Sequence, residues 1–173
     1  KNETIYFTMD NPNTKKPEIY RSRMSAGKYL TPEKLPSVIN REGTTIYNTF
    51  ISRDEDFLIA CIDGIENEIN PGVANYYVFF RDENDNWSEP VSFGAEINIK
   101  GSTATSASVS PDGKYLFFAA QKLSDENRLL LKNKTLTNLI KISNSVENGN
   151  YDIYWVDASV IDSLKEKAIE TSN

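Results

Sequence analysis

The chain contains no histidine and one cysteine, Cys61, among its 173 residues. Without histidine it cannot form a Ser-His-Asp or Cys-His catalytic group or an imidazole zinc site, and it lacks the commonest general base. A single cysteine cannot form a disulfide within the chain, so cysteine usage does not indicate a redox compartment. Because Cys61 lies in the apolar run at 57–62, we expect a buried core residue rather than a nucleophile.

Long apolar runs and an excess of positive charge are also missing. No segment approaches the roughly 18 apolar residues of a membrane-spanning helix, so no membrane-spanning segment is predicted. Lys and Arg number 19 against 25 Asp and Glu, and the charges are interspersed rather than gathered in a basic stripe. Nucleic acid is therefore not expected as a partner. No signal peptide is visible at Lys1, which is expected of a mature or truncated chain.

No metal, cofactor or catalytic residue is predicted. The acidic loop at 82–86 imitates the oxygen spacing of a calcium loop, but Trp87 stands where glycine is required and Phe93 where a bidentate glutamate is required. A hairpin turn explains this loop better. No spacing singles out two carboxylates for glycoside hydrolysis.

The chain has instead an internal repeat. The sequence Ser-Pro-Asp-Gly-Lys-Tyr-Leu-Phe-Phe-Ala at 110–119 reads as a tight turn followed by a strand, and 50–60 has the same pattern 58 residues earlier. Asp and Gly supply the side-chain hydrogen bonds and the positive φ of a tight reversal, and Pro presets φ at the second turn position. Each segment therefore predicts a β-hairpin.

The residues that follow each hairpin repeat as well. Segment 19–40 corresponds to 76–98, with Asn40 and Asn98 58 residues apart, and a third partial copy lies at 152–157 after a longer insertion. One unit is four strands. Recurring four-strand units are the mark of propeller blades, which must stack to bury both faces.

The predicted fold is all-β, a β-propeller portion with about three four-stranded blades. A single partial domain spans 1–173, with blade units at approximately 4–40, 48–98 and 105–157. The first unit lacks its first strand, and the last stops after its third.

Three segments resemble the WD-repeat-like propellers of the TolB type: the hairpin at 110–119, Trp-Ser-Glu-Pro at 87–90, and Asn-Gly-Asn-Tyr-Asp-Ile-Tyr-Trp-Val-Asp-Ala at 148–158. The likeness is greatest to extracytoplasmic bacterial members and covers nearly the whole chain. It implies a ring of about six blades and a periplasmic or cell-surface location. Either the missing blades belong to the same protein or a second copy completes the ring. The second unit departs from the pattern, since Arg-Asp-Glu at 53–55 replaces Pro-Asp-Gly and leaves the turn type open.

Two helices are expected. Within 121–151, Leu136, Leu139 and Ile140 predict a short helix capped by Thr135 or Thr137; an additional hairpin at 128–132 and 137–142 is the alternative. The resemblance places a helical insert here and so favours the helix. Apolar positions 160, 161 and 164 predict a C-terminal helix at 158–168.

Blade connectivity separates two sides of the molecule. We define the tight-turn side by 25–28, 52–56, 82–86 and 110–114, and the long-loop side by 10–18, 40–47, 63–75, 98–105 and 121–151. Binding residues concentrate on long loops held by rigid scaffolds, which favours the long-loop side. The first strands of blades line a propeller's channel, so the predicted channel-facing binding residues are Asn48, Thr49, Ser106 and Ser108.

Two classes of function fit these features. The first is a non-enzymatic binding or scaffolding module that presents its long-loop side to a protein or a cell-envelope polymer. The alternative is the propeller portion of a hydrolase or lyase whose catalytic residues lie outside this chain, which rests on fold analogy alone.

The repeat makes a prediction about stability. Trp87→Ala and Gly113→Val should each lower the melting temperature, the first by removing packing between blades and the second by forcing a positive φ on a β-branched residue. Trp155 is expected to pack between blades in the same way. Unchanged melting temperatures for both variants would contradict the assignment of blades.

Overall fold

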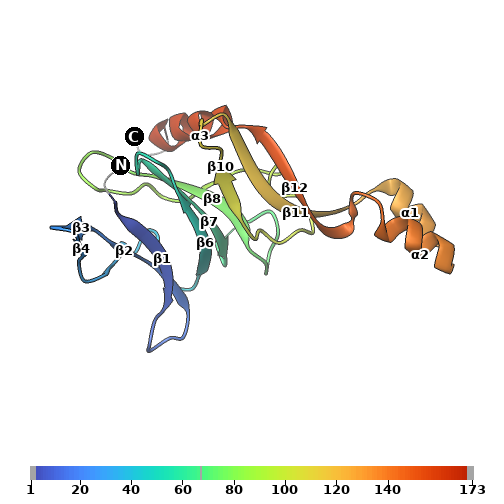
Figure 1. Cartoon of the computed structure of the whole chain (residues 1–173), viewed down its shortest axis with the longest axis horizontal. Coiled ribbons are helices and arrows are strands. Elements are labelled where there is room, and N and C mark those ends of the chain that lie inside the picture. Colours follow the sequence, from blue (N-terminus) through green and yellow to red (C-terminus); the bar gives the residue numbers. More distant parts are fainter. Residues whose placement is uncertain (1–2, 67, 171–173) are drawn as a thin grey trace.

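Strands dominate the computed structural model, which describes residues 3–66 and 68–170 (Figure 1). It is 39% strand and 16% helix, and the strands form antiparallel sheets, so the prediction of a mainly β chain is confirmed. Three sheets follow one another along the chain.

The first sheet has three strands. β1 (Ile5–Asp10) pairs with β2 (Pro17–Ser22), and β2 pairs in turn with β5 (Glu33–Lys34). The segment of chain that connects β2 to β5 forms a separate two-stranded ribbon, β3 (Met24–Ser25) and β4 (Lys28–Tyr29).

The middle sheet has four strands in sequential order. They are β6 (Thr45–Ile51), β7 (Phe57–Asp63), β8 (Asn75–Phe80) and β9 (Val91–Ser92). Every residue of β8 is buried, and so is every residue of β7 apart from its two ends. A strand buried on both faces requires a neighbour on each side of its sheet.

The third sheet has three strands, β10 (Ala107–Val109), β11 (Tyr115–Leu123) and β12 (Asn148–Asp157). The described residues also form three helices: α1 (Asp125–Leu131) and α2 (Leu136–Ser143) between β11 and β12, and α3 (Ser159–Glu170) after β12. None of the described helices is long and apolar enough to cross a membrane.

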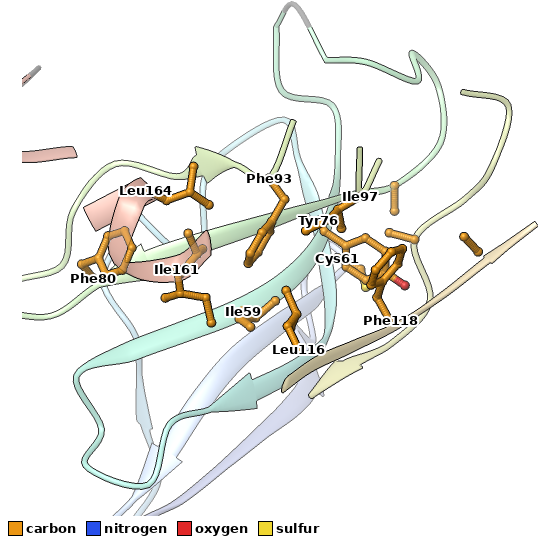
Figure 2. Packing of buried hydrophobic residues seen from close by; sticks show 14 of the residues in the cluster. Ile59, Cys61, Tyr76, Phe80, Phe93, Ile97, Leu116, Phe118, Ile161 and Leu164 are labelled. Carbon is orange, nitrogen blue, oxygen red and sulfur yellow. The ribbon is translucent and has the colours of Figure 1, made fainter. Parts of the chain in front are cut away.

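The three sheets pack face to face in chain order, because side chains alternate across β7. Leu58, Ala60 and Ile62 join a core shared with the first sheet. Ile59 and Cys61 point the other way, into a core shared with the third sheet. Figure 2 shows this second core, in which Leu116 and Phe118 of β11 and Ile161 and Leu164 of α3 also take part.

Two asparagines perform the same task in successive repeats. Oδ1 of Asn40 accepts a hydrogen bond from the Ile19 amide at 2.7 Å, and its Nδ2 donates to the Ile19 carbonyl at 2.9 Å. Asn98 does the same with Tyr76, at 2.6 and 3.2 Å. Each amide side chain thus satisfies a backbone peptide in an earlier strand of its own unit, β2 for Asn40 and β8 for Asn98, which explains why asparagine recurs at this spacing.

The two tight hairpin turns are also alike. The hydroxyl of Ser52 accepts hydrogen bonds from the amides of residues 56 and 57, and that of Ser110 accepts from 114 and 115. The fourth turn residue has positive φ in both, +77° at Gly113 and +59° at Glu55. The Arg-Asp-Glu sequence therefore makes the same turn as Pro-Asp-Gly, although glutamate rarely adopts this backbone conformation.

The segment 121–151 forms two helices, where one short helix was expected. Thr135 caps α2, as predicted, but α1 occupies the segment that the alternative hairpin would have used, so that alternative is wrong. The C-terminal helix runs from Ser159 to Glu170, beyond the expected end at 168, because Ala168 still packs against the core.

Asn98→Ala should lower the free energy of unfolding by about 2–3 kcal/mol, because it leaves the buried amide and carbonyl of Tyr76 without this partner. Urea unfolding measures the loss. Asn84→Ala, at an exposed turn position, is the matched control and should change the free energy by less than about 0.5 kcal/mol. Equal effects for the two variants would contradict the role assigned to Asn98.

Candidate functional site

The predicted residue Asn48 lies where the register of β6 against β7 shifts, between Tyr47 and Phe50. Its φ is +48°, and its Nδ2 donates to the carbonyl oxygen of Thr105. This bond joins the first strand of the middle sheet to the segment that leads into the third. Thr49 follows in the same irregular stretch and is half-buried.

Ser108 lies in β10 and Ser106 directly before it, and both residues are exposed. The Ser106 carbonyl accepts a hydrogen bond from the Tyr76 hydroxyl at 2.9 Å, which ties this strand to the middle sheet. Ser108 pairs with Phe117 of β11, and both serines border a hollow of about 180 Å³ together with that ring. The structure thus brings Asn48 to Thr105, the residue before Ser106, while Ser108 lies further along in β10 opposite Phe117. That the four residues face a channel stays a prediction.

A network of charged residues joins the first two sheets on the tight-turn side. Arg21 is buried, and its Nη1 and Nη2 donate to the two carboxylate oxygens of Asp85, the first at 2.6 Å. Its Nε donates to Glu33 at 2.7 Å, and Arg23 donates to Asp85 at 2.8 Å. The hydrogen bonds that Asp85 receives from Arg21 and, to a smaller extent, from Arg81 lower its pKa to about 2.

Arg81 extends the same network. Its Nε lies 2.7 Å from Asp85 Oδ1 and its Nη1 3.3 Å from Glu55 Oε2. Glu55 Oε2 also accepts a hydrogen bond from the Tyr6 hydroxyl at 3.0 Å, and the Arg81 guanidinium lies 5.8 Å from the ring centre of Trp87. Every guanidinium of the network is bonded to a carboxylate. The arrangement therefore clamps β1 and β2 to the turns of the middle sheet and stabilises the positive φ of Glu55.

The tight-turn side also carries a hollow of about 650 Å³ between the two serine turns and the start of α3. Its apolar lining includes Phe50, Phe57, Val109 and Ile161.

Two hollows lie on the long-loop side. One of about 550 Å³ separates the β1–β2 loop from the crossing at 40–44. The other, of about 440 Å³, lies where the crossing at 99–101 meets the end of β11 and the start of α1. Lys100, Lys122 and Arg128 line this second hollow, and Lys122 Nζ lies 2.7 Å from Glu147.

The insert forms a helical hairpin that projects from the sheets at the ends of β11 and β12 (Figure 1). Its base is fixed by Asn127, whose buried Nδ2 donates to Ser145 Oγ at 2.9 Å and to the Glu147 carbonyl at 3.0 Å. Ser124 and Thr135 cap the two helices, and Lys141 pairs with Glu126 at 2.9 Å. The hairpin therefore has a defined conformation.

The hairpin exposes large apolar side chains. They are Leu129, Leu136, Leu139, Ile140 and, just after α2, Val146. Leu136 is 74% exposed although it opens an amphipathic helix. An apolar cluster on a projecting element of defined shape is a feature of interaction sites.

Two further sequence-based interpretations can be compared with the structure. Cys61 is fully buried, as expected, and burial raises the pKa of its thiol to about 12, which keeps it neutral and unreactive.

The acidic loop at 82–86 is a turn, because Asp82 Oδ1 accepts hydrogen bonds from the amides of Asn84 and Asn86. Within residues 3–66 and 68–170, no group of three or more Cys, Asp or Glu residues could hold a metal ion.

The two tryptophans have different surroundings. Trp87 is buried in the core between the first and middle sheets, as predicted. Trp155 was expected to pack between blades, but it is 61% exposed on the outer face of β12, and its ring meets only Tyr115 edge to face at 5.1 Å among the described aromatic residues. The prediction for Trp155 is wrong within the described chain, because none of the sheets formed by residues 3–66 and 68–170 packs against that face.

Sequence reasoning missed the charged network and α1. The network joins residues up to 64 positions apart, so no local pattern indicates it. For α1 a signal was present, since Ser124 followed by Asp125 and Glu126 is a typical helix start.

No protein-family model, curated protein sequence or solved structure matches this chain.

The charged network generates a prediction about pH. Asp85→Asn should lower the free energy of unfolding by about 1–3 kcal/mol at neutral pH, because Arg21 loses an ionised partner. The folded pKa is about 2 and the ordinary value 3.8, so the wild-type advantage is complete above the ordinary pKa. It is then lost as the pH falls through the folded value.

Urea unfolding of both proteins between neutral pH and about pH 2 measures this difference. The two free energies of unfolding should converge at the acid end. A difference that does not change with pH would show that the Asp85 carboxylate is not the group responsible.

Proposed function

We propose that the chain is part of a β-propeller that acts as a non-enzymatic binding or scaffolding module. Its long-loop side, with the α1–α2 hairpin foremost, contacts a protein or a cell-envelope polymer. Following the TolB-type resemblance, we place this module in the periplasm or at the cell surface.

The propeller part of the proposal is supported by the stacking of successive sheets. Three antiparallel sheets follow one another in the chain, and the middle one shares a core with each neighbour. Asn40 and Asn98 hold equivalent strands in equivalent ways, as do Ser52 and Ser110 in the turns. Repeated local chemistry of this kind is what stacked repeats of one unit require.

The exposed apolar cluster of the hairpin carries the binding part of the proposal. Leu136, Leu139 and Ile140 of α2 are exposed and do not belong to the core of the sheets, whereas Ile142 of the same helix is buried. Exposed leucine and isoleucine gain free energy when a partner covers them, at roughly 25 cal/mol per Å² of apolar surface. Lys100, Lys122 and Arg128 line the neighbouring hollow with one acidic residue, Asp125, and Lys122 is paired with Glu147. Basic groups still exceed acidic ones there, so the contact area combines apolar and basic groups. This composition favours an acidic amphipathic segment of a protein as the partner.

The test uses the chain immobilised on a surface and a displayed library of random peptides. Peptides selected on the wild type should be rich in apolar and acidic residues. Their affinity should fall at least about tenfold for the double variant Leu136→Asp, Ile140→Asp, because both side chains belong to the proposed contact.

Leu30→Asp is the matched control, since Leu30 is an exposed leucine near the tight-turn side. It should leave the affinity of the selected peptides unchanged. Peptides that bind both variants as well as the wild type would contradict the proposed location. Binding of purified peptidoglycan or lipopolysaccharide, lost in the hairpin variant only, would identify an envelope polymer as the partner instead.

A further inference from the structure

The outer surface of the third sheet is apolar and uncovered. Tyr115 and Phe117 of β11 and Tyr151, Ile153 and Trp155 of β12 form what we call the C-terminal face. The register places Phe117 opposite Trp155, and it places positions 119 and 121 opposite Ile153 and Tyr151. Because side chains alternate along a strand, these residues share one side of the sheet.

The repeat shows what kind of surface covers such a face. Ile19, Tyr76 and Ile153 occupy equivalent positions of β2, β8 and β12. Their exposed fractions are 0%, 2% and 78%. The first two are buried because the next sheet in the chain packs against them. Ile153 has the same place in its own sheet, and no sheet of the described chain covers it.

The opposite end of the molecule carries the complementary surface. Ile5, Phe7 and Met9 of β1 and Tyr20 of β2 form what we call the N-terminal face, with Phe7 and Tyr20 stacked at 6.3 Å. Ile5 and Met9 are 41% and 42% exposed. Tyr20 is equivalent to Tyr77 of the middle sheet, which is buried against the first sheet.

We infer that the C-terminal face of one chain packs against the N-terminal face of a second copy, and that two copies close into a pair with two identical contacts. Each contact then continues the interface that already joins the first sheet to the middle sheet and the middle sheet to the third. The two faces suit one another because each is equivalent to one side of that internal interface. A closed pair leaves neither face exposed, whereas a single chain exposes both.

The inference does not depend on the proposed binding function, because the α1–α2 hairpin belongs to neither face.

Light scattering across a range of concentrations tests the proposal on the 173-residue chain. The expected mass is that of two chains of 19.6 kDa each. Ile153→Asp and Ile5→Asp should each raise the dissociation constant at least tenfold, and a circular dichroism melt of each variant confirms that the monomer folds. Leu136→Asp, in the hairpin, is the matched control and should keep the mass of the pair.

A mixture of Ile153→Asp and Ile5→Asp tests whether each contact joins a C-terminal face to an N-terminal face. Ile153→Asp retains an intact N-terminal face and Ile5→Asp an intact C-terminal face. A mixed pair therefore keeps one intact contact of the two, and the mixture should form pairs more tightly than either variant alone. Acrylamide quenching of Trp155 fluorescence should fall when pairs form. A single-chain mass at every concentration, a pair that Ile5→Asp leaves intact, or open-ended polymers would each overturn the proposal.

Discussion

The structure depends on one constraint: the middle sheet is apolar on both faces and must be covered on both. Its strands β7 and β8 alternate between two cores, with Leu58 and Ile62 directed to one side and Ile59 and Cys61 to the other. The first and third sheets cover the two faces of the middle sheet. Each of them is itself covered on only one face, the one that contacts the middle sheet. The uncovered end faces follow from the same constraint, because a stack of sheets always ends in two surfaces that its own members cannot bury.

Polar interactions act on two sides of the stack. On one side, Asn40 and Asn98 satisfy backbone groups of the strands before them, and their hydrogen bonds are buried or partly buried. On the other, Arg21 and Arg81 join the turns of the middle sheet to the first sheet through Asp85 and Glu55. Truncating such groups costs more than the net free energy of their hydrogen bonds, since the partners left behind remain desolvated. The apolar cores of the stacked sheets provide most of the stability. Of these polar groups, the charged network joins one sheet to the next, and the asparagines fix the segments that lead out of a sheet.

The repeat made much of this predictable from sequence. Turn residues and strand patterns are local, so the hairpins at 50–60 and 110–119, the buried thiol of Cys61 and the cap at Thr135 could all be recognised. Contacts between distant residues could not be, which is why the charged network around Arg21 was missed. The type of turn at Glu55 could not be predicted from the local sequence, because the positive φ of this residue is supported by Tyr6 and Arg81, which lie far away in the chain. Trp155 was expected between blades, but the described chain places no sheet against the face of β12 that carries it.

Native-state hydrogen exchange tests the central claim most directly, since it measures the free energy at which each backbone amide becomes exposed. The account predicts that amides of β7 and β8, between the two cores, exchange only through global unfolding. Amides of the α1–α2 hairpin, and of β1 and β12 at the free edges, should open at lower free energies. Equal protection throughout the chain, or a middle sheet that opens before the end sheets, would contradict the claim that the doubly covered sheet holds the structure together.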